Sequence, residues 1–398
     1  MDFAYSESEE AFRRELREWL AVNLAEHRKR FPPSDDELTL HPDRSFESSL
    51  AWHKRMHAGG WVGIHWPKEY GGRGATLLEQ MIFTEELIAA GAPPGVNIIG
   101  LTMVGPAVIT HGTEAQRRRR LPPVLSADEI WCQGFSEPGA GSDLATLSTR
   151  AVEEGDDFVV SGQKVWTSNA HRSHYCILLV RTDPHAPKHR GISCLLVDMK
   201  SPGITVRPLV QITGDAEFNE VFFDQVRVPK ANLLGPKNGG WEVAITILMY
   251  ERMAIGSTVI LHRYIDRLLS LARRTARDGE AAGADPILRQ ELARIYLEGR
   301  VLRLTGLRYI TRQLRGEPPG PEGSVLKLTL TETYRAMAET AGRILGPTVQ
   351  LWKGTEWAPE GGRWAFQALF ALRFGIAGGT TEIQKNIIGE RILGLPKG

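Results

Sequence analysis

The sequence predicts an α+β multidomain protein with an N-terminal α-helical domain over 1–130, a middle antiparallel β-barrel or sandwich over 131–236, and a C-terminal α-helical bundle over 237–398. Two observations predict this fold class. The chain has 398 residues, which favours two or three domains at about 150 residues each. Apolar residues change from helical to strand-like spacing near residue 131 and return to helical spacing after residue 236. We expect the two helical segments to pack around the β domain.

The helices of the first segment have recognisable start signals. In a capping box, a Ser or Thr is followed three residues later by Glu or Gln. The segment contains three such pairs: Ser6 with Glu9, Thr76 with Glu79, and Thr113 with Gln116. Behind the first pair, one helical stripe of apolar side chains comprises Phe12, Leu16, Trp19, Leu20 and Leu24. Gly91 and Pro93 are expected to end the second helix.

The middle segment consists of short runs rich in Val, Ile and Phe, which Gly and Pro separate. The runs cover 157–166, 174–182, 191–199, 204–210 and 219–229. This spacing favours a compact antiparallel barrel or sandwich. In the last segment, helical spacing covers stretches near 241–275, 287–315, 322–345, 363–373 and 381–393.

Composition excludes several classes of protein. Lys and Arg number 48 and Asp and Glu 47, so the net charge is +1 and a polybasic nucleic-acid or membrane surface is not expected. We interpret the arginines at 117–120 as a solvated helix face. The cysteines are too few for a disulfide framework, and neither they nor the histidines near residue 60 have metal-ligand spacing (Cys132, Cys176, Cys194; His53, His57, His65). The charged N-terminus is unlike a signal peptide, and we expect a reducing, cytoplasmic location.

Two motifs in the middle segment could bind a ligand. The run QGFSEPGAGSDLA at 133–145 combines three glycines with short polar residues, so its backbone N–H groups could approach a phosphate or a carbonyl-rich group. In GQKVWTSNA at 162–170, Trp166 with the hydroxyl of Ser168 nearby could flank a planar ring and hydrogen-bond to its edge. The alternatives are an ordinary turn for the first motif and a core Trp at a strand end for the second.

Glu251 and Arg252 are the only charged residues between Val243 and Leu261. A carboxylate in an apolar helical stretch is costly unless it is paired or functional. Burial would raise its pKa, as a general base that works near neutral pH requires. An ion pair that fixes packing is the structural alternative. A membrane span is excluded because the two charges interrupt this apolar run.

A last motif, FGIAGGTTEIQKNIIGERILGLP, covers 374–396. Gly378 and Gly379 precede Thr380, where a helix is expected to begin. Backbone N–H groups at such a helix start can bind a phosphate or a polar cofactor edge. A capped C-terminal helix without a ligand is the alternative.

These motifs resemble those of the acyl-CoA dehydrogenase family over essentially the whole chain. The resemblance depends on FSEPGAGSDLA, GQKVWTSNA, FNEVFFDQVRVP and GGTTEIQKNIIGERILGLP, which occur in the family's order and approximate spacing. It implies the predicted α–β–α fold and FAD bound between the middle domain and the C-terminal bundle, with a neighbouring subunit completing the site. It also implies a homotetramer built as a dimer of dimers.

The resemblance implies a set of FAD-binding residues. The backbone at 133–136 should line the flavin ring, Trp166 should flank it, and Ser168 should approach its N5 atom. An arginine that reaches FAD across the dimer is either Arg274 or Arg277, and Arg343 takes the place of a common flavin-binding Gln. The full set implied is Gln133, Phe135, Ser136, Ser142, Trp166, Ser168, Arg274, Arg277, Arg343, Thr380 and Glu382.

The resemblance also identifies Glu251 as the catalytic base. Many members carry their catalytic Glu directly before the Gly-Thr of the last motif, where this chain has Gly378. A subgroup similar to isovaleryl- and long-chain acyl-CoA dehydrogenases instead places it on the long helix just before an Arg, as in the pair Glu251 and Arg252. Ser142, Arg252 and Gly378 are the implied substrate-binding residues.

The implied reaction is α,β-dehydrogenation of an acyl-CoA thioester, with electron-transfer flavoprotein as electron acceptor. The resemblance extends to bacterial members that act in fatty-acid or steroid side-chain breakdown. Three alternatives stay open: an acyl-CoA oxidase or flavin monooxygenase on the same fold, a catalytically silent subunit of a hetero-oligomer, and a CoA- or lipid-binding module without redox chemistry.

Overall fold

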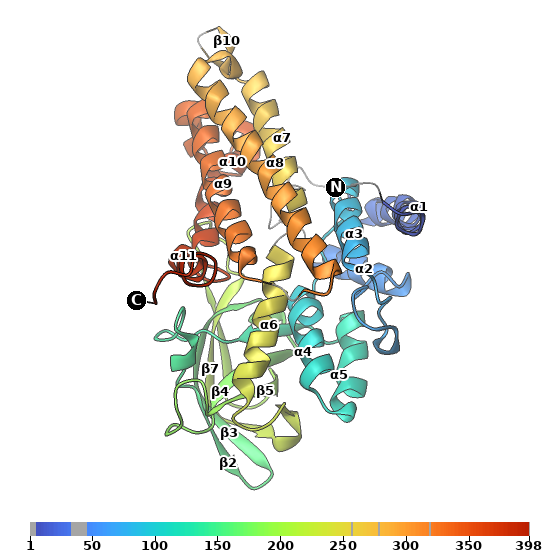
Figure 1. The fold of residues 1–398 in the computed structure, drawn as a ribbon, viewed down its shortest axis with the longest axis vertical. Helices are drawn as coiled ribbons and strands as arrows, with labels where there is room; N and C mark the ends of the chain where they lie inside the picture. The colour runs from blue at the N-terminus through green and yellow to red at the C-terminus, as the bar shows by residue number, and fades with distance from the viewer. Residues whose placement is uncertain (1–4, 33–45, 256–257, 278, 318–319, 398) are drawn as a thin grey trace. The chain divides into compact units, whose positions relative to one another are not determined.

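The computed structural model describes residues 5–32, 46–255, 258–277, 279–317 and 320–397, without the side chains of 250–255 and 258. Contacts along the chain divide it into two compact units. The helical unit comprises 1–45, 76–93 and 252–398, and the sheet unit comprises 46–75 and 94–251. Figure 1 shows the elements of both units by label.

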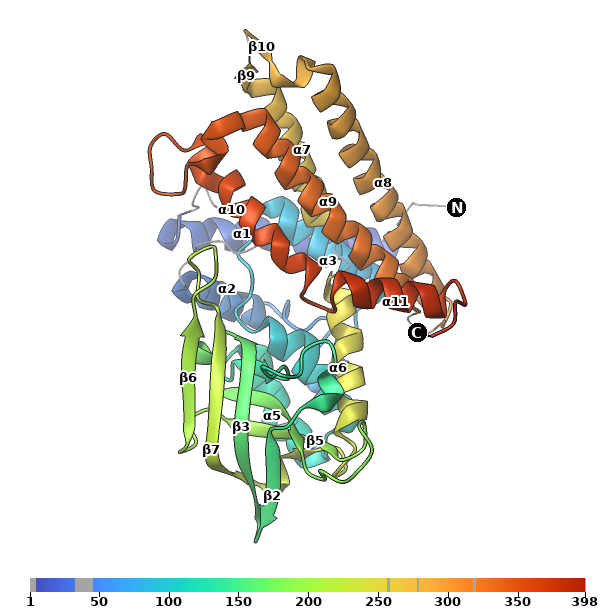
Figure 2. The same ribbon diagram turned by 90° about the vertical axis from the view of Figure 1, so that its left-hand side faces the viewer.

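The sheet unit contains an eight-stranded sheet in which seven strands follow the order β6-β7-β3-β2-β4-β5-β8, and β1 pairs with β4. Figure 2 shows β6, β7, β3 and β2 side by side. The strand bounds are β1 Trp131–Gly134, β2 Arg150–Glu154, β3 Asp157–Ser168, β4 Tyr175–Arg181, β5 Ile192–Asp198, β6 Ile204–Leu209, β7 Phe218–Pro229 and β8 Leu233–Leu234. Five of these are the strand-like runs of the sequence. Pairing is antiparallel except that β1, and one residue of β2, run parallel to β4.

The strands β4 and β5 form the centre of this unit. Their residues are buried almost without interruption. Cys176 on β4, Cys194 on β5 and Cys132 on β1 are buried and form no disulfide. Continuous apolar runs of this kind are typical of strands covered on both faces. The helix α6, Gly240–Ile255, begins against β5, because a Cβ atom on Gly240 would lie 2.5 Å from the carbonyl carbon of Ser193.

The helices α2 (Phe46–Ala58), α4 (Gly105–His111) and α5 (Glu114–Ser126) complete the sheet unit, with a π-helical turn at Gly100–Val104. Asn97 connects them to the sheet. Its buried side-chain amide donates to the carbonyls of Val124 and Glu129, both at 2.9 Å, and accepts the N–H of Trp131 at 3.0 Å. One side chain therefore satisfies three backbone groups between α5 and β1.

The interpretation of the arginines at 117–120 as a solvated helix face is wrong for Arg120. Arg118 and Arg119 are exposed, but Arg120 is buried. Its guanidinium carbon lies 4.2 Å from the ring centre of Tyr175, and the side chain pairs with Glu129 at 3.4 Å. A planar cation can stack on an aromatic face while it pairs with a carboxylate, which the run of identical residues does not reveal.

The helical unit combines helices from both ends of the sequence. They are α1 Glu7–Arg30, α3 Leu77–Ala90, α7 Thr258–Arg274, α8 Pro286–Leu314, α9 Glu322–Leu345, α10 Arg363–Phe370 and α11 Thr381–Arg391, with a short hairpin of β9 Ala276–Arg277 and β10 Glu280–Ala281. Arg17 on α1 holds Glu86 on α3 with two hydrogen bonds of 2.7 and 2.8 Å. Buried side chains of α7, α8 and α9 share one apolar core with Trp364.

The predicted fold class, helical, then β, then helical along the chain, is confirmed. All three capping boxes are present, and Gly91 ends α3 in a left-handed conformation. The predicted stretch near 241–275 corresponds to α6 and α7. The N-terminal helices are divided, however: α1 and α3 belong to the helical unit, and α2, α4 and α5 to the sheet unit. Within the described residues, no helix is long and apolar enough to span a membrane.

We predict that Gly240→Ala lowers the free energy of unfolding by about 1–3 kcal/mol. The added Cβ would overlap the β5 backbone, and a backbone that is paired in a sheet shifts only at an energetic cost. Gly141→Ala is the matched control, since a Cβ there meets no heavy atom within 4 Å. Urea unfolding of both variants measures the difference. Equal stabilities would contradict the close packing of α6 on β5.

Candidate functional site

The site residues predicted from the sequence fall into two groups, one in each unit. The sheet unit carries Gln133, Phe135, Ser136, Ser142, Trp166, Ser168 and Glu251, and the helical unit carries Arg252, Arg274, Arg277, Arg343, Gly378, Thr380 and Glu382. Each group is described by itself.

In the sheet unit, two distant motifs lie side by side. The backbone N–H of Val165 donates to the carbonyl of Ser136 at 2.9 Å, so the segment after β1 is joined to β3. Phe135 is buried, while Gln133 and Ser136 are partly exposed. Gly134 lets β1 pack closely on β4, because a Cβ there would lie 2.7 Å from the side chain of Leu178. The two motifs are therefore parts of one surface.

Trp166 is the most unusual residue of this surface. It lies at an irregularity in the pairing of β3 with β7, between Lys164 and Thr167, and its φ is +59°. A left-handed φ is strained for a bulky residue, and such strain occurs preferentially at functional sites. The indole is 59% exposed and contacts Phe218 edge-on at 6.0 Å between ring centres. The structural alternative, a core Trp, is wrong.

The two serines of the predicted site, Ser168 and Ser142, differ in their position relative to Trp166. Ser168 ends β3 opposite Phe218, close along the chain to the exposed indole. Ser142 is exposed in the glycine-containing loop, where its neighbour Asp143 pairs with Lys188 at 2.5 Å. The structure thus brings Ser136 and Trp166 onto connected backbone and leaves Ser142 on the exposed part of its loop.

A buried ion pair between Glu137 and Lys164 holds this surface together, and the sequence reasoning missed it. The Lys164 ammonium is fully buried and donates to Glu137 Oε1 at 2.8 Å and to the Phe135 carbonyl at 3.0 Å. The other Glu137 oxygen accepts the backbone N–H of Ser148 at 2.7 Å, and Thr149 N–H donates to Oε1 at 2.9 Å. The available signal was a Lys whose position alternates with the apolar Phe158 and Val160 on the inward face of the strand.

The protonation states of this pair follow from its surroundings. Burial tends to raise the pKa of Glu137, but the charge and hydrogen bonds of Lys164, with those of Thr149 and Ser148, hold it at about 2. Burial lowers the pKa of Lys164, and Glu137 opposes that shift. The carboxylate therefore stays ionised down to strongly acidic pH.

In the helical unit, the last motif forms a turn before α11. Thr380 is the N-cap of this helix, and its hydroxyl accepts the N–H of Ile383 at 3.2 Å. Gly378 and Gly379 have φ of +65° and +88°, a region that favours glycine. Gln384 is buried and donates to the Gly378 carbonyl at 2.8 Å. Glu382 is exposed in the first turn. The predicted helix start is confirmed.

The candidate arginines have intramolecular partners. Arg274 pairs with Glu360 at 2.6 Å, and Arg343 pairs with Glu291. Arg277 donates to the carbonyl of Arg343 at 3.4 Å, which brings two of the three together. The choice between Arg274 and Arg277 stays a prediction.

Glu251 lies in α6, but its side chain and that of Arg252 are outside the described residues. The described part of α6 shows the setting along the helix. Val243, Ala244 and Ile247 are completely buried. On the same helix, Thr246 hydrogen-bonds to His111 at 2.8 Å. The predicted apolar environment is confirmed for this part of α6, and the role of Glu251 stays a prediction.

The residues present fit a flavin. The sheet unit offers an exposed indole with a hydroxyl two residues further on, and a partly exposed backbone at Gln133 and Ser136, as a planar ring with a polar edge requires. The helical unit offers a capped helix start with a glycine turn, which suits a phosphate-bearing cofactor. Among the described residues, no group of three His, Cys, Asp or Glu side chains could hold a metal ion.

Comparison with known families finds three matches in sequence order. Residues 6–128 match the acyl-CoA dehydrogenase N-terminal domain, residues 132–226 the middle domain, and residues 238–393 the C-terminal domain. Among curated proteins, the chain is 41% identical over 394 residues to the acyl-CoA dehydrogenase IpdE1 of Mycobacterium tuberculosis, covering 98% of each chain. It is 31% identical to human mitochondrial short-chain specific acyl-CoA dehydrogenase, over 74% of this chain and 72% of the human protein.

Solved structures show the same likeness. A chain of the "Tcur3481-Tcur3483 steroid ACAD" has a TM-score of 0.85 and 31% identity, with complete coverage of both chains. A chain of the ChsE4-ChsE5 complex from Mycobacterium tuberculosis has a TM-score of 0.85 and 33% identity, again with complete coverage.

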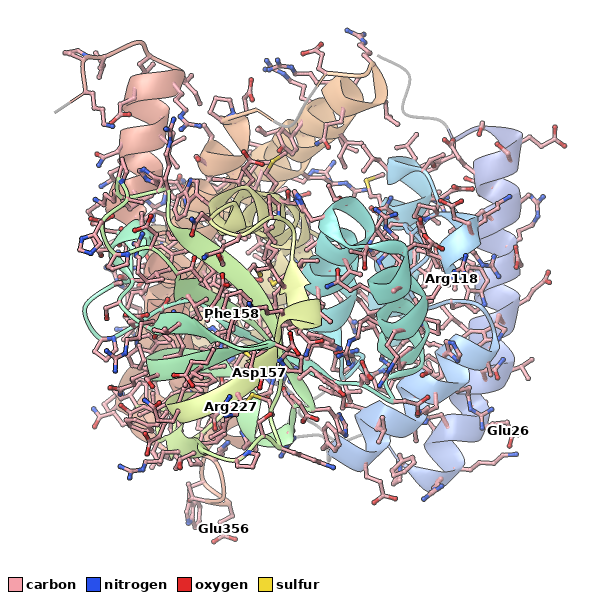
Figure 3. The ribbon with its side chains drawn as sticks, turned by 90° about the horizontal axis from the view of Figure 1, so that it is seen from below. Glu26, Arg118, Asp157, Phe158, Arg227 and Glu356 are labelled. Carbon is pink, nitrogen blue, oxygen red and sulfur yellow. The ribbon has the colours of Figure 1, made fainter. Side chains whose placement is uncertain are left out.

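We predict that Lys164→Met and Glu137→Gln each lower the free energy of unfolding by about 3–5 kcal/mol, because each leaves one buried group without its partner. The double variant should lose less than the sum of the two. Arg227→Met is the control: the exposed Arg227 on β7 pairs with Asp157 on β3 and with Glu154 at the end of β2. Figure 3 labels Arg227 and Asp157. An exposed pair contributes about 0–1 kcal/mol.

Urea unfolding at neutral and acidic pH measures this. Because the folded pKa of Glu137 is held at about 2, below its usual 4.5, the ionised carboxylate stabilises the fold above that usual value, and this contribution is lost as the pH falls toward 2. Glu137→Gln should lack this component of acid sensitivity. Equal losses for Lys164→Met and Arg227→Met would contradict the role of the buried pair.

Proposed function

The chain belongs to the acyl-CoA dehydrogenase family, and from this premise we propose that it catalyses the FAD-dependent α,β-dehydrogenation of an acyl-CoA thioester to the trans-2-enoyl-CoA. The family matches cover nearly the whole chain and support this activity. The observation that carries the proposal is the strained, exposed Trp166 on the strand that hydrogen-bonds to Ser136. When bound, FAD supplies a hydride acceptor, its N5 atom, for the β-hydrogen of the substrate.

In this proposal, Glu251 removes the α-proton. The α C–H of a thioester is a very weak acid, so the base must be strong and the developing charge must be stabilised. Val243, Ala244 and Ile247, earlier on α6, are buried. Exclusion of water by a bound acyl chain would raise the basicity of Glu251. Arg252, the next residue, completes the pattern of the subgroup with its base on this helix.

Other residues of this chain bind and orient. Trp166 would flank the flavin ring, with Ser136 near its pyrimidine edge and Ser168 near N5. Thr380 and Glu382 would contact the adenosine half of FAD, and Ser142 its phosphates or the CoA arm. Either Arg274 or Arg277 is the proposed contact from a neighbouring subunit, and Arg343 is a proposed flavin contact at the position of a common Gln. These roles follow the family's motifs and are supported by the exposure of Trp166 and the helix start at Thr380.

Gly378 has a separate role in the proposal. Its backbone N–H would donate to the thioester carbonyl and stabilise the enolate-like charge on the oxygen. One preorganised donor of this kind contributes roughly 3–4 kcal/mol to lowering the barrier. The left-handed φ of +65° at this position suits glycine and would strain the Glu that many family members carry there.

We propose a bulky or branched acyl-CoA, such as a steroid side-chain thioester, as substrate. Similarity to a structure titled "steroid ACAD" supports this class. Electron-transfer flavoprotein is the proposed electron acceptor, and a cytoplasmic location stays a prediction. A panel of straight, branched and steroid acyl-CoAs, scored by anaerobic flavin bleaching, tests the substrate class. Stoichiometric peroxide formation in air would favour the acyl-CoA oxidase alternative.

We predict that Glu251→Gln retains FAD but loses anaerobic bleaching by acyl-CoA, with a rate about 10²–10⁴-fold lower because the base is gone. Glu242→Gln is the control, since Glu242 is exposed in the first turn of the same helix. Stopped-flow absorbance of the oxidised flavin is the measurement. Wild-type bleaching by Glu251→Gln would exclude this residue as the base.

The subunit composition provides a further prediction. The family pattern implies a homotetramer, whereas two similar structures carry titles that name two proteins each. We expect the chain expressed alone to form a tetramer that contains FAD, by light scattering and the flavin-to-protein ratio. FAD uptake and activity that appear only on co-expression with a second family member would instead support a hetero-oligomer.

A further inference from the structure

In the turn before α11, the backbone carbonyl groups are hydrogen-bonded within the protein, whereas several backbone N–H groups are not. The carbonyls of Phe374, Gly378, Gly379 and Thr380 all accept hydrogen bonds from within the helical unit. In the part of the chain that the structure describes, no acceptor is found for the N–H groups of Gly378, Gly379 and Thr380. These three residues are partly exposed, so their N–H groups are available to a ligand or to water.

Lys327 holds two of these four carbonyls. It lies on α9, and its ammonium donates to the carbonyl of Phe374 at 2.7 Å and to that of Gly379 at 2.8 Å. These two bonds join the beginning and the end of the turn. Thr331, one helical turn further along α9, adds a bond to Phe374 at 3.1 Å, and Gln384 holds Gly378.

A buried lysine that holds backbone carbonyls carries a desolvation cost. Lys327 is only 7% exposed, and among the described residues no carboxylate forms an ion pair with it. Burial lowers its pKa, and the charge of Glu382 opposes this shift. Burying an ammonium without a counter-ion is costly, whereas an apolar side chain of similar length would pack at that place without this cost. Packing alone therefore does not explain this residue.

We propose that Lys327 is a positioning residue. Together with Gln384 it holds the carbonyls of Gly378 and Gly379 inward, which turns the N–H groups of Gly379 and Thr380 outward and fixes the backbone that carries Gly378 for the acyl-CoA thioester and FAD. The proposal rests on the proposed function, which assigns Gly378 and Thr380 to those ligands. Hydrogen bonding of the ammonium to the Gly379 carbonyl also polarises that peptide unit and makes the N–H of Thr380 a stronger donor.

The test compares Lys327→Met with wild-type holoenzyme. The variant keeps the length and apolar stem of the side chain but loses both hydrogen bonds. We expect FAD to dissociate at least about tenfold faster on dilution, seen as a rise in flavin fluorescence, because Thr380 loses its fixed position. In enzyme kept saturated with FAD, kcat should fall about tenfold with KM within twofold, as expected when an interaction is lost only in the transition state.

Three further variants make the result specific. Thr331→Val removes only the second bond to Phe374 and should change FAD release less than threefold. Gln384→Leu frees the Gly378 carbonyl and should reproduce the effect on kcat, which also covers the case that Lys327→Met does not fold. Lys385→Met is the matched control, because Lys385 is an exposed lysine on α11 and should leave all values unchanged.

The outcomes separate the two proposals. Wild-type FAD release and kcat in both Lys327→Met and Gln384→Leu would overturn the role of Lys327 and leave the proposed function intact. A wild-type chain that binds no FAD, alone or with a second family member, would overturn the proposed function and this inference with it.

Discussion

The buried ion pair between Glu137 and Lys164 is the interaction on which the candidate site of the sheet unit depends. Lys164 lies on β3, two residues before Trp166, and its ammonium donates to the carbonyl of Phe135 and to the carboxylate of Glu137, both in the motif at 133–145. The same carboxylate receives backbone N–H groups from Ser148 and Thr149. Both ends of the glycine-containing loop are therefore attached to one point in the core, while the glycines between them remain outside. A strained, exposed Trp can persist beside this point because the backbone on both sides is fixed.

The helical unit uses a buried lysine for a related purpose but with different partners. Lys164 has a carboxylate to balance its charge, whereas the bonds of Lys327 go to two backbone carbonyls. In both cases the ammonium donates to a carbonyl of a residue outside the helices and strands, Phe135 or Gly379. In both cases the segment concerned is one that the family's motifs assign to ligand binding. The core therefore determines which backbone groups these loops leave for a ligand.

Local sequence signals were reliable where the interaction is local. The capping boxes at Ser6, Thr76 and Thr113 join residues three apart, so their spacing alone predicts the helix starts. The strand-like runs likewise became β3 to β7, because alternation and apolar content reflect burial on a sheet. The prediction for Arg120 was wrong because its partners, Glu129 and Tyr175, are set by tertiary packing. The parallel pairing of β1 with β4 was missed for the same reason, since its partners are more than 40 residues apart.

The sequence by itself determined the fold class, the family and the list of candidate residues, because these depend on periodicity and on motifs that are contiguous along the chain. Only the tertiary structure decided how those residues are held. It placed Ser136 against Val165, exposed Trp166 at an irregularity of β3, and divided the N-terminal helices between two units. It also showed that the buried ammonium groups of Lys164 and Lys327 donate to backbone carbonyls of the two segments proposed to bind ligands. The physical reason is that a buried charge is defined by what surrounds it, and its partners here lie 27 to 52 residues away along the chain.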